Sequence, residues 1–265
     1  MNWLQIGGIA VGIIGFLFLI TIHEGGHYLV SKLLGVRVNE FSVGMGPLIS
    51  QKEKNGTKYS FRLIPIGGYC ALEGEFDDDM SDEEIENYVD TDPNAFVNQP
   101  FWKQFLILVA GSAVNFIFGF LLFVIVYSIV AKGEVGFVRI LAISWRDCFG
   151  MMKDIFAFLG GLFTGTSSVN DVSGIVGIVA IVADTASYGL INVVYLVALI
   201  SVNLSIMNML PIPGLDGGRI FVSIIKIISG GKLSQKAENI INGVGMVLLL
   251  IIIVLITIKD VIKLV

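Results

Sequence analysis

Two histidines one helical turn apart are the residues best suited to chemistry in this sequence. They are His23 and His27 of the segment HEGGH, and the chain contains no other histidine. On a helix, positions i and i+4 share a face, so both imidazoles can bind one metal ion. Glu24 lies beside that face, where its carboxylate can take a proton from metal-activated water. The alternative interpretation is a pair of unconnected core histidines.

The apolar surroundings of HEGGH favour the metal-binding interpretation. Imidazoles and a carboxylate without partners are costly in hydrocarbon, and ionisable residues at membrane depth are functional candidates. Gly25 and Gly26 each lower helix stability by roughly 1 kcal/mol relative to Ala. A bound metal would compensate for these costs.

Four uncharged runs predict an α-helical integral membrane protein. Residues 1–22, 104–131, 185–215 and 239–258 contain no Asp, Glu, Lys or Arg. Each run is long enough to span roughly 30 Å of hydrocarbon. The composition agrees, with 55% hydrophobic residues and a mean hydropathy of +0.83. The first run has no basic start and no obvious cleavage site, so we expect a retained helix rather than a signal peptide.

The basic residues predict the orientation of the chain in the membrane. Eleven of the seventeen Lys and Arg residues lie between the first two runs or between the last two. Loops rich in Lys and Arg stay in the cytoplasm. Both termini are therefore expected outside, with HEGGH towards the cytoplasmic side.

A small β element is expected between the first two membrane helices. Asn55-Gly56 separates two strand-like segments, which is a strong hairpin pattern. The element either packs against and seals the end of the first helix, or offers an exposed edge that binds an extended peptide by strand addition. Under the second interpretation, the candidate substrate-binding residues are Gly44, Met45, Gly46, Phe61 and Leu63.

Asp216 is the candidate third metal ligand. Catalytic zinc sites usually have three protein ligands, and with no further histidine the third must be a carboxylate or a cysteine. Asp216 is the first charged residue after the third uncharged run, in the segment NMLPIPGLDGGR. Pro211 and Pro213 cannot continue a regular helix, and broken helices are tolerated where they line a cavity or are buried in protein. The alternative is that Asp216 caps the helix that follows.

HEGGH followed by NMLPIPGLDGGR resembles the site-2 protease family of intramembrane zinc metalloproteases. The similarity extends over nearly the whole chain, through GMGP, PIGGY, NQPFWKQFLILVAGSAVNF and LFTGTSSVNDVSGIVGI. The branch it resembles most is the bacterial regulator-of-sigma-factor type, which cleaves anti-sigma factors and signal-peptide remnants.

The resemblance implies one zinc ion per chain, held by His23, His27 and Asp216, with Glu24 as general base. Asn203 and Asn208 match family asparagines implicated in handling substrate, although hydrogen bonding between helices would also suit them. The implied activity is hydrolysis of peptide bonds within transmembrane segments of single-span proteins, in the bacterial cytoplasmic (inner) membrane. The expected partners are these substrates and membrane lipid, with no nucleic acid and an unknown oligomeric state.

The chain departs from this branch in one major respect. Family members usually carry one or two PDZ domains after the second membrane segment, and the short connection here cannot hold one, either as a naturally minimal form or by removal of the domain. Ser112 and Ile175 stand where prolines are common in the family, which puts local helix geometry in doubt.

The expected segments follow one another along the chain. They are a transmembrane helix with HEGGH (1–34), a cytoplasmic or membrane-associated β element (35–72), an acidic cytoplasmic loop (73–100), a second transmembrane helix (101–131), a short extracytoplasmic connection with an amphipathic or apolar segment (132–184), a third transmembrane helix ending in NMLPIPGLDGG (185–215), a cytoplasmic amphipathic segment (216–238) and a fourth transmembrane helix (239–258).

Two other functions are compatible with the same residues. A metal-ion transporter would place His23, His27 and Asp216 on a permeation path, but it would be expected to show further ionisable residues along that path, and the spans offer almost none. A catalytically inactive binding protein of the same fold would be expected to lack a ligand or the base.

Overall fold

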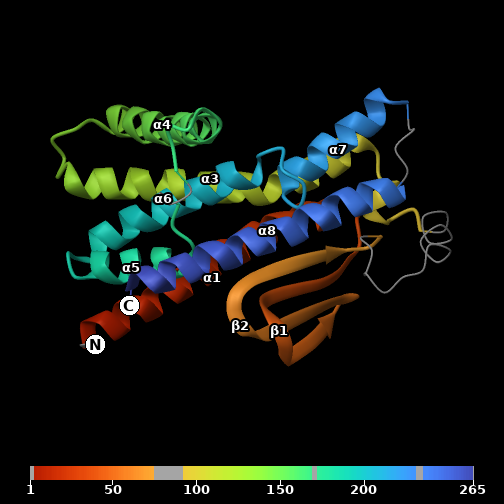
Figure 1. The fold of residues 1–265 in the computed structure, drawn as a ribbon, viewed down its shortest axis with the longest axis horizontal. Coiled ribbons are helices and arrows are strands. Elements are labelled where there is room, and N and C mark those ends of the chain that lie inside the picture. The colour runs from red at the N-terminus through yellow and green to blue at the C-terminus, as the bar shows by residue number, and fades with distance from the viewer. Residues whose placement is uncertain (1–2, 75–91, 169–171, 231–234, 265) are drawn as a thin grey trace. The chain divides into compact units, whose positions relative to one another are not determined.

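The computed structural model describes residues 3–74, 92–168, 172–230 and 235–264. Within them, the chain is mostly helical, with one small antiparallel sheet between the first two long helices. The elements are α1 (Trp3–Leu33), β1 (Val38–Lys54), β2 (Thr57–Leu72), the 3-10 turn η1 (Phe96–Asn98), α3 (Phe101–Val130), α4 (Phe137–Thr164), α5 (Ile175–Ala186), α6 (Leu190–Asn208), α7 (Asp216–Ile228) and α8 (Gln235–Leu264) (Figure 1).

Four helices of the described residues are long and apolar enough to cross a membrane. The four segments are Ala10–Leu33, Phe101–Val130, Leu190–Asn208 and Ile240–Ile262. The predicted fold class is therefore confirmed. The acidic segment expected from residue 73 onwards falls mostly outside the described residues.

The chain divides into two compact units. One, which we call the sheet unit, comprises Phe16–Val114 and Asn208–Val247. The other, which we call the helical unit, comprises Met1–Gly15, Asn115–Met207 and Leu248–Val265. Helices α1, α3 and α8 each contribute residues to both units.

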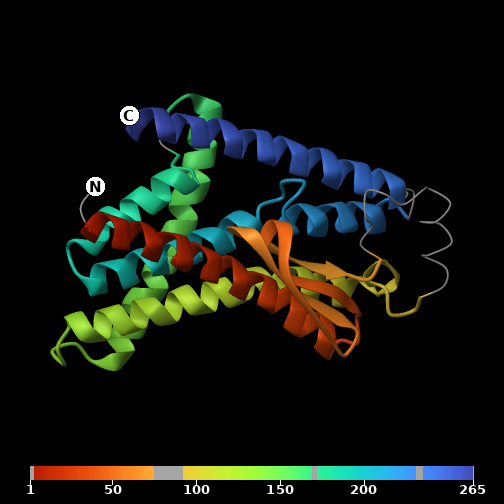
Figure 2. The ribbon, with the colours of Figure 1, turned by 90° about the horizontal axis from the view of Figure 1, so that it is seen from below.

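The sheet of the sheet unit is a bent hairpin. Asn55 and Gly56 both have positive φ, 53° and 72°, and they join Lys54 to its partner Thr57. This is the mirror-image turn that the Asn-Gly pair predicts. Because the strands are 17 and 16 residues long and bend, residues 40–43 of β1 pair on both sides, with residues 58–61 and with residues 68–71 of β2. In Figures 1 and 2 the sheet lies beside the second half of α1.

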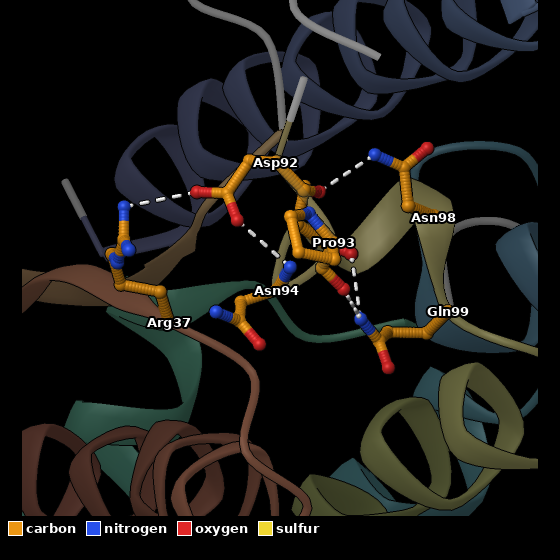
Figure 3. Close-up of polar contacts among 7 residues, drawn as sticks. Arg37, Asp92, Pro93, Asn94, Asn98 and Gln99 are labelled. Atoms are coloured by element: carbon orange, nitrogen blue, oxygen red, sulfur yellow. Dashed lines mark hydrogen bonds and ion pairs between the residues drawn. The ribbon is translucent and has the colours of Figure 1, made fainter. Parts of the chain in front are cut away.

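Polar contacts tie the segment before α3 to the start of the sheet (Figure 3). Arg37 Nη1 donates to Asp92 Oδ2 at 2.9 Å, and Asn98 Nδ2 donates to the Asp92 carbonyl at 2.8 Å. Gln99 Nε2 donates to the Pro93 carbonyl at 2.7 Å. These bonds fix where α3 begins.

The end of α1 is held by the first turn of α3. Lys103 Nζ donates to the carbonyl of Leu34, the residue directly after α1, at 3.1 Å, so a cation lies at the C-terminal end of the helix. A buried apolar cluster joins the sheet, α3 and α7, and Tyr28 and Val30 of α1 pack against it. Its members are Val36, Val38, Leu72, Phe96, Ile107, Leu108 and Ile220.

In the helical unit, α3 packs closely against α6 and against α4. A Cβ atom on Gly119 of α3 would lie 2.9 Å from the Ala198 carbonyl oxygen of α6, so the two backbones are in contact there. Helix α4 crosses the second half of α3, where Tyr127 donates to Asp147 at 2.5 Å (Figure 2). Among the described residues, the expected connection at 132–184 contains the 28-residue α4 and all but the last two residues of the 12-residue α5.

Candidate metal centre

The first two ligand candidates come from one face of α1. His23 and His27 are both buried, at 6% and 7% exposure. Their Nε2 atoms are 3.2 Å apart, and the rings meet edge to face. The helix therefore presents two imidazole nitrogens to one point, as the i, i+4 spacing predicts.

The third candidate comes from the first residue of α7. After α6 ends at Asn208, residues 209–215 form a tight turn in which Ile212 N–H donates to the Leu210 carbonyl at 2.7 Å. Asp216 opens α7, and it does not cap that helix, whose N-cap is Leu215. The Asp216 Oδ2 atom lies 3.2 Å from His23 Nε2 and 3.3 Å from His27 Nε2.

The glycines after Asp216 let the turn fold back on its own helix. A Cβ atom on Gly217 would overlap the Met209 carbonyl, and one on Gly218 would overlap the Ile212 carbonyl. Side chains at these two positions would push the turn away from α7. The Asp-Gly-Gly sequence therefore brings the carboxylate to the histidines.

These three ligand atoms form a triangle that fits zinc. Its edges are 3.2, 3.2 and 3.3 Å. Tetrahedral zinc with bonds of roughly 2.0–2.1 Å requires ligand atoms about 3.3 Å apart. The buried Asp216 Oδ2 has no hydrogen-bond partner within the described part of the chain, so the atom that would bind the metal is unsatisfied by protein. The three residues are also the one cluster of His, Cys, Asp and Glu with ligand-like spacing among the described residues.

Contacts around the triangle prepare two of its members for metal binding. His27 Nδ1 lies 2.8 Å from the Ile107 carbonyl of α3, and as the donor it leaves the Nε2 lone pair for a metal. Burial acts to raise the pKa of the Asp216 carboxyl, but the adjacent His27 and His23 outweigh it and hold this pKa below its usual value. This shift requires positive charge beside Asp216, which the imidazoles carry when protonated and which a metal ion would supply when they bind it.

Two glycines allow α1 and α3 to approach closely at the site, and the sequence analysis did not predict this role for them. Gly111 of α3 faces both imidazoles, and a Cβ atom there would overlap His27 Nε2 and lie 2.9 Å from His23 Nε2. Gly26 of α1 faces α3, and its Cβ atom would lie 2.6 Å from the Ala110 carbonyl oxygen. The sequence pattern that could have indicated this close contact is the small-residue run Ala-Gly-Ser at 110–112, because small residues mark close helix contacts in membranes.

Glu24 is half-buried and lies next to the sheet. A Cβ atom on Gly68 of β2 would lie 3.8 Å from Glu24 Cγ, so the strand backbone passes close to this side chain. Glu24 follows the ligand His23 directly. A peptide held along this part of β2 would therefore be near both the ligands and the carboxylate.

The other predicted site residues differ in their distance from the histidines, in the unit to which they belong and in their exposure to solvent. Asn208 belongs to the sheet unit, with Nδ2 3.4 Å from His23 Nε2. Asn203 is an exposed residue of the helical unit. In the sheet, Met45, Phe61 and Leu63 are exposed apolar side chains, at 47%, 49% and 60%.

The two predicted glycines of the sheet differ in their surroundings. Gly44 is buried, with φ of 84°, and its Cβ atom would lie 2.8 Å from the Ile64 carbonyl oxygen. Gly46 is exposed, with φ of 79°. Both therefore shape the bend in β1.

Comparison with known proteins agrees with this geometry. The chain matches peptidase family M50 over residues 11–252. A protein of Clostridium acetobutylicum named provisionally as a zinc metalloprotease is 28% identical over 340 residues, which cover 96% of this chain and 97% of the relative. A similarly named protein of Fusobacterium nucleatum is 29% identical over 347 residues, covering 97% of this chain and 98% of the relative.

A third relative is named as a protease, with its assignment also provisional. This protein, eep of Enterococcus faecalis, is 24% identical over 412 residues, covering 94% of this chain and 97% of the relative. All three alignments are longer than the 265 residues of this chain, so each relative contains residues without a counterpart here. That difference is consistent with the missing PDZ domain. The chain belongs to peptidase family M50, the site-2 protease family, and is a membrane zinc metalloprotease.

Proposed function

We propose that this protein hydrolyses peptide bonds inside the transmembrane segments of single-span membrane proteins, with anti-sigma factors or signal-peptide remnants as substrates. The observation that carries the proposal is the triangle of His23, His27 and Asp216, with Glu24 directly after His23 on α1, in a chain whose described residues include four helices long and apolar enough to cross a membrane. One zinc ion per chain would occupy this triangle.

Glu24 is the proposed general base. Zinc held by the three ligands would acidify water and polarise a peptide carbonyl. The Glu24 carboxylate takes the proton of the attacking water and passes it to the leaving amine nitrogen. Its position directly after His23, on the same helix, keeps it close to the reacting groups.

Substrate binding is proposed to use the sheet. A transmembrane helix already uses its backbone groups in hydrogen bonds, so the substrate must unwind before its carbonyl can be attacked. The backbone of Phe61 pairs with Val43 on one side and with Ser50 on the other, so a substrate strand cannot pair with it there. We therefore propose that Phe61 contacts substrate through its exposed side chain, together with Met45 and Leu63. Gly44 and Gly46 set the bend that presents these side chains.

Asn208 is proposed to orient the substrate near the metal, because its amide lies 3.4 Å from His23 Nε2. Asn203 has the same proposed role, on the resemblance to family asparagines alone. The alternative role for both side chains is hydrogen bonding between helices.

The proposed location is the bacterial cytoplasmic (inner) membrane, with both termini extracytoplasmic and the active site towards the cytoplasm. The distribution of Lys and Arg supports this orientation. The proposed partners are substrate segments and membrane lipid, with no nucleic acid.

Cleavage by the purified protein tests the proposal. The protein would be incubated with single-span substrates, with and without a chelator, and the products mapped by mass. We expect a cut within the apolar segment, loss of cleavage with chelator, and loss of roughly 100-fold or more in Glu24→Gln with zinc still bound. The control is Glu134→Gln, at an exposed acid of the helical unit.

Two results would contradict the proposal. Substantial cleavage by Glu24→Gln would exclude the general-base role, and cleavage that survives zinc removal would exclude the metal centre. Metal-dependent ion flux in liposomes without proteolysis would favour a transporter instead.

A further inference from the structure

Helix α4 carries an exposed surface that the proposed chemistry does not use. The helix lies wholly in the helical unit, and one of its faces is buried, at Ile140, Ser144 and Cys148, which follow one another every four residues. Cys148 belongs to a buried cluster with Phe123 of α3 and Ala198 of α6. The residues on the other faces of α4 are largely exposed, so their chemistry indicates what the helix meets.

The first exposed row of α4 is apolar and largely aromatic. Residues seven or eleven positions apart lie on the same face of a helix with 3.6 residues per turn. Four residues at this spacing, which we call the aromatic row, are Val138, Trp145, Phe149 and Phe156, and their exposures are 80%, 54%, 44% and 55%. A contiguous apolar surface on the outside of a protein marks contact with lipid or with another protein.

The second exposed row lies directly beside the first and is basic. Arg139, Arg146 and Lys153, which we call the basic row, follow one another at intervals of seven residues, and all three are exposed. Arg146 pairs with its neighbour Asp147 at 3.1 Å, yet the Arg146 side chain stays 75% exposed. By the same helical spacing, Asp147 and Asp154 lie on the far side of the basic row from the aromatic row. Around α4 the order is therefore aromatic, basic, acidic and then buried.

Contacts with α3 show how these rows are oriented along a membrane span. Asp147 accepts a hydrogen bond from Tyr127, in the last turn of α3. The ring of Trp145 meets those of Phe116 and Phe120 edge to face, with centroids 6.2 and 5.9 Å apart. Because a helix rises about 1.5 Å per residue, these two phenylalanines lie roughly 10–16 Å from Tyr127 towards the middle of the span. The aromatic row therefore faces the middle of the span, and Asp147 faces its end.

This order is that of a helix lying in the membrane interface. Such helices turn aromatic and aliphatic side chains towards the acyl chains and hold Lys and Arg at the headgroups, and Trp is enriched at this depth. Figure 2 shows α4 crossing the second half of α3, as a helix in the plane of the membrane would cross a span. The basic row lies between the side that faces the acyl chains and the side that faces water. It is therefore at the level of the lipid phosphates.

We propose that α4 binds anionic phospholipid headgroups through the basic row. Three cations along one helix attract lipids with a net negative charge, whereas a zwitterionic headgroup carries a cation of its own that opposes this attraction. The inference deepens the proposed membrane-lipid partner and rests on the proposed membrane placement of the chain. It does not depend on proteolysis.

The test measures quenching of Trp145 fluorescence by brominated lipids. Trp3→Phe and Trp102→Phe leave Trp145 as the single tryptophan of the whole chain. The protein would be reconstituted in vesicles with equal amounts of phosphatidylcholine and phosphatidylglycerol, with bromine on the acyl chains of one lipid or of the other. We expect quenching by both lipids, with an apparent preference of about threefold or more for phosphatidylglycerol. High salt should reduce this preference, because roughly 1 M salt screens charges beyond about 3 Å.

The variants separate the basic row from the net charge of the chain. Replacing Arg139, Arg146 and Lys153 together by Gln should bring the preference to about one, because the charges that attract the anionic lipid are gone. Arg139→Lys with Arg146→Lys keeps these charges and should keep the preference. An equal loss of charge elsewhere should also leave it in place. The control therefore replaces three exposed lysines of the hairpin, Lys52→Gln, Lys54→Gln and Lys58→Gln.

Three results would overturn the proposal. Equal quenching by the two lipids, or a preference that survives the triple Gln substitution, would exclude selection by the basic row. Weak quenching of Trp145 by both lipids would exclude the interfacial placement and would favour a protein, such as a second copy of this chain, on this face of α4. A chain that shows the lipid preference but cleaves no substrate would contradict the proposed proteolysis alone.

Discussion

At the scale of single residues, the two glycines of HEGGH have opposite surroundings. Gly26 faces α3, where a Cβ atom would lie 2.6 Å from the Ala110 carbonyl oxygen and 2.9 Å from Gly111 Cα. At Gly25, apart from the adjacent residues and nearby backbone of its own helix, no atom of the described residues lies within 4 Å of the Cβ position. One glycine is therefore required by packing, and the other is free to change as far as packing is concerned.

This difference predicts opposite results for two neighbouring substitutions. Gly26→Ala should separate α1 from α3, lower stability by about 1–3 kcal/mol through overpacking and reduce zinc content. Gly25→Ala should keep its zinc and match or exceed wild-type stability, because Ala is the better helix former. Thermal unfolding and zinc content per chain measure both. Equal losses in the two variants would contradict the packing explanation.

The clustering of the three candidate ligands could be predicted from the sequence because their types and spacing carry the chemistry. His23 and His27 followed from the helical period, and Asp216 followed from the need for a third ligand and from the broken third helix. The contacts of Gly111 and the Ile107 carbonyl depend on how α3 packs on α1, which no local pattern determines. The same limit applies to Asn203 and Asn208, which lie five residues apart but belong to different units.

At the scale of elements, one ion pair stabilises the bend of the sheet. Arg62 Nη2 lies 2.9 Å from Glu40 Oε1, and Arg62 Nη1 donates to the Gly46 carbonyl at 2.9 Å. Burial acts to raise the pKa of Glu40, but hydrogen bonds from Ser60, Arg62 and Tyr69 outweigh it and lower this pKa from its ordinary value of 4.5. The charged pair therefore holds the bend of β1 that carries Gly44 and Met45.

The lowered pKa predicts a pH-dependent contribution to stability. A carboxyl whose pKa is lower in the folded state stabilises the fold above its unfolded pKa, and this contribution is lost as the pH falls through the folded value. At pH 7, Glu40→Gln should therefore be less stable than the wild type by about 1 kcal/mol. Below about pH 4 the difference should shrink. Unfolding of both proteins at pH 7 and pH 3.5 measures it, and a constant difference would contradict the charge-based explanation.

The elements themselves were only partly predictable. The Asn55-Gly56 hairpin followed from turn chemistry, and the four spans followed from hydropathy. The double pairing of residues 40–43 did not, because it results from a bend that brings distant parts of β2 together. The apolar residues of α4 and α5 likewise do not show by themselves whether a helix spans the membrane or lies across another.

At the scale of the whole molecule, the candidate metal centre joins segments that are far apart in the chain. Without it, the buried Asp216 Oδ2 has no hydrogen-bond partner among the described residues. Zinc should raise the free energy of unfolding by about 2.7 kcal/mol at 100 times its dissociation constant. Thermal unfolding with chelator and with added zinc measures this gain. Asp216→Ala should abolish most of it, whereas a full gain in that variant would contradict the assigned ligand set.

The distance along the chain between α1 and α7 has a consequence for biosynthesis. The two histidines are synthesised early, but Asp216 follows about 190 residues later, which takes roughly 10–40 s at elongation rates of about 5–20 residues per second. During that interval the nascent chain holds two of the three candidate zinc ligands. If these residues form the zinc site as proposed, the site is incomplete until synthesis has passed Asp216.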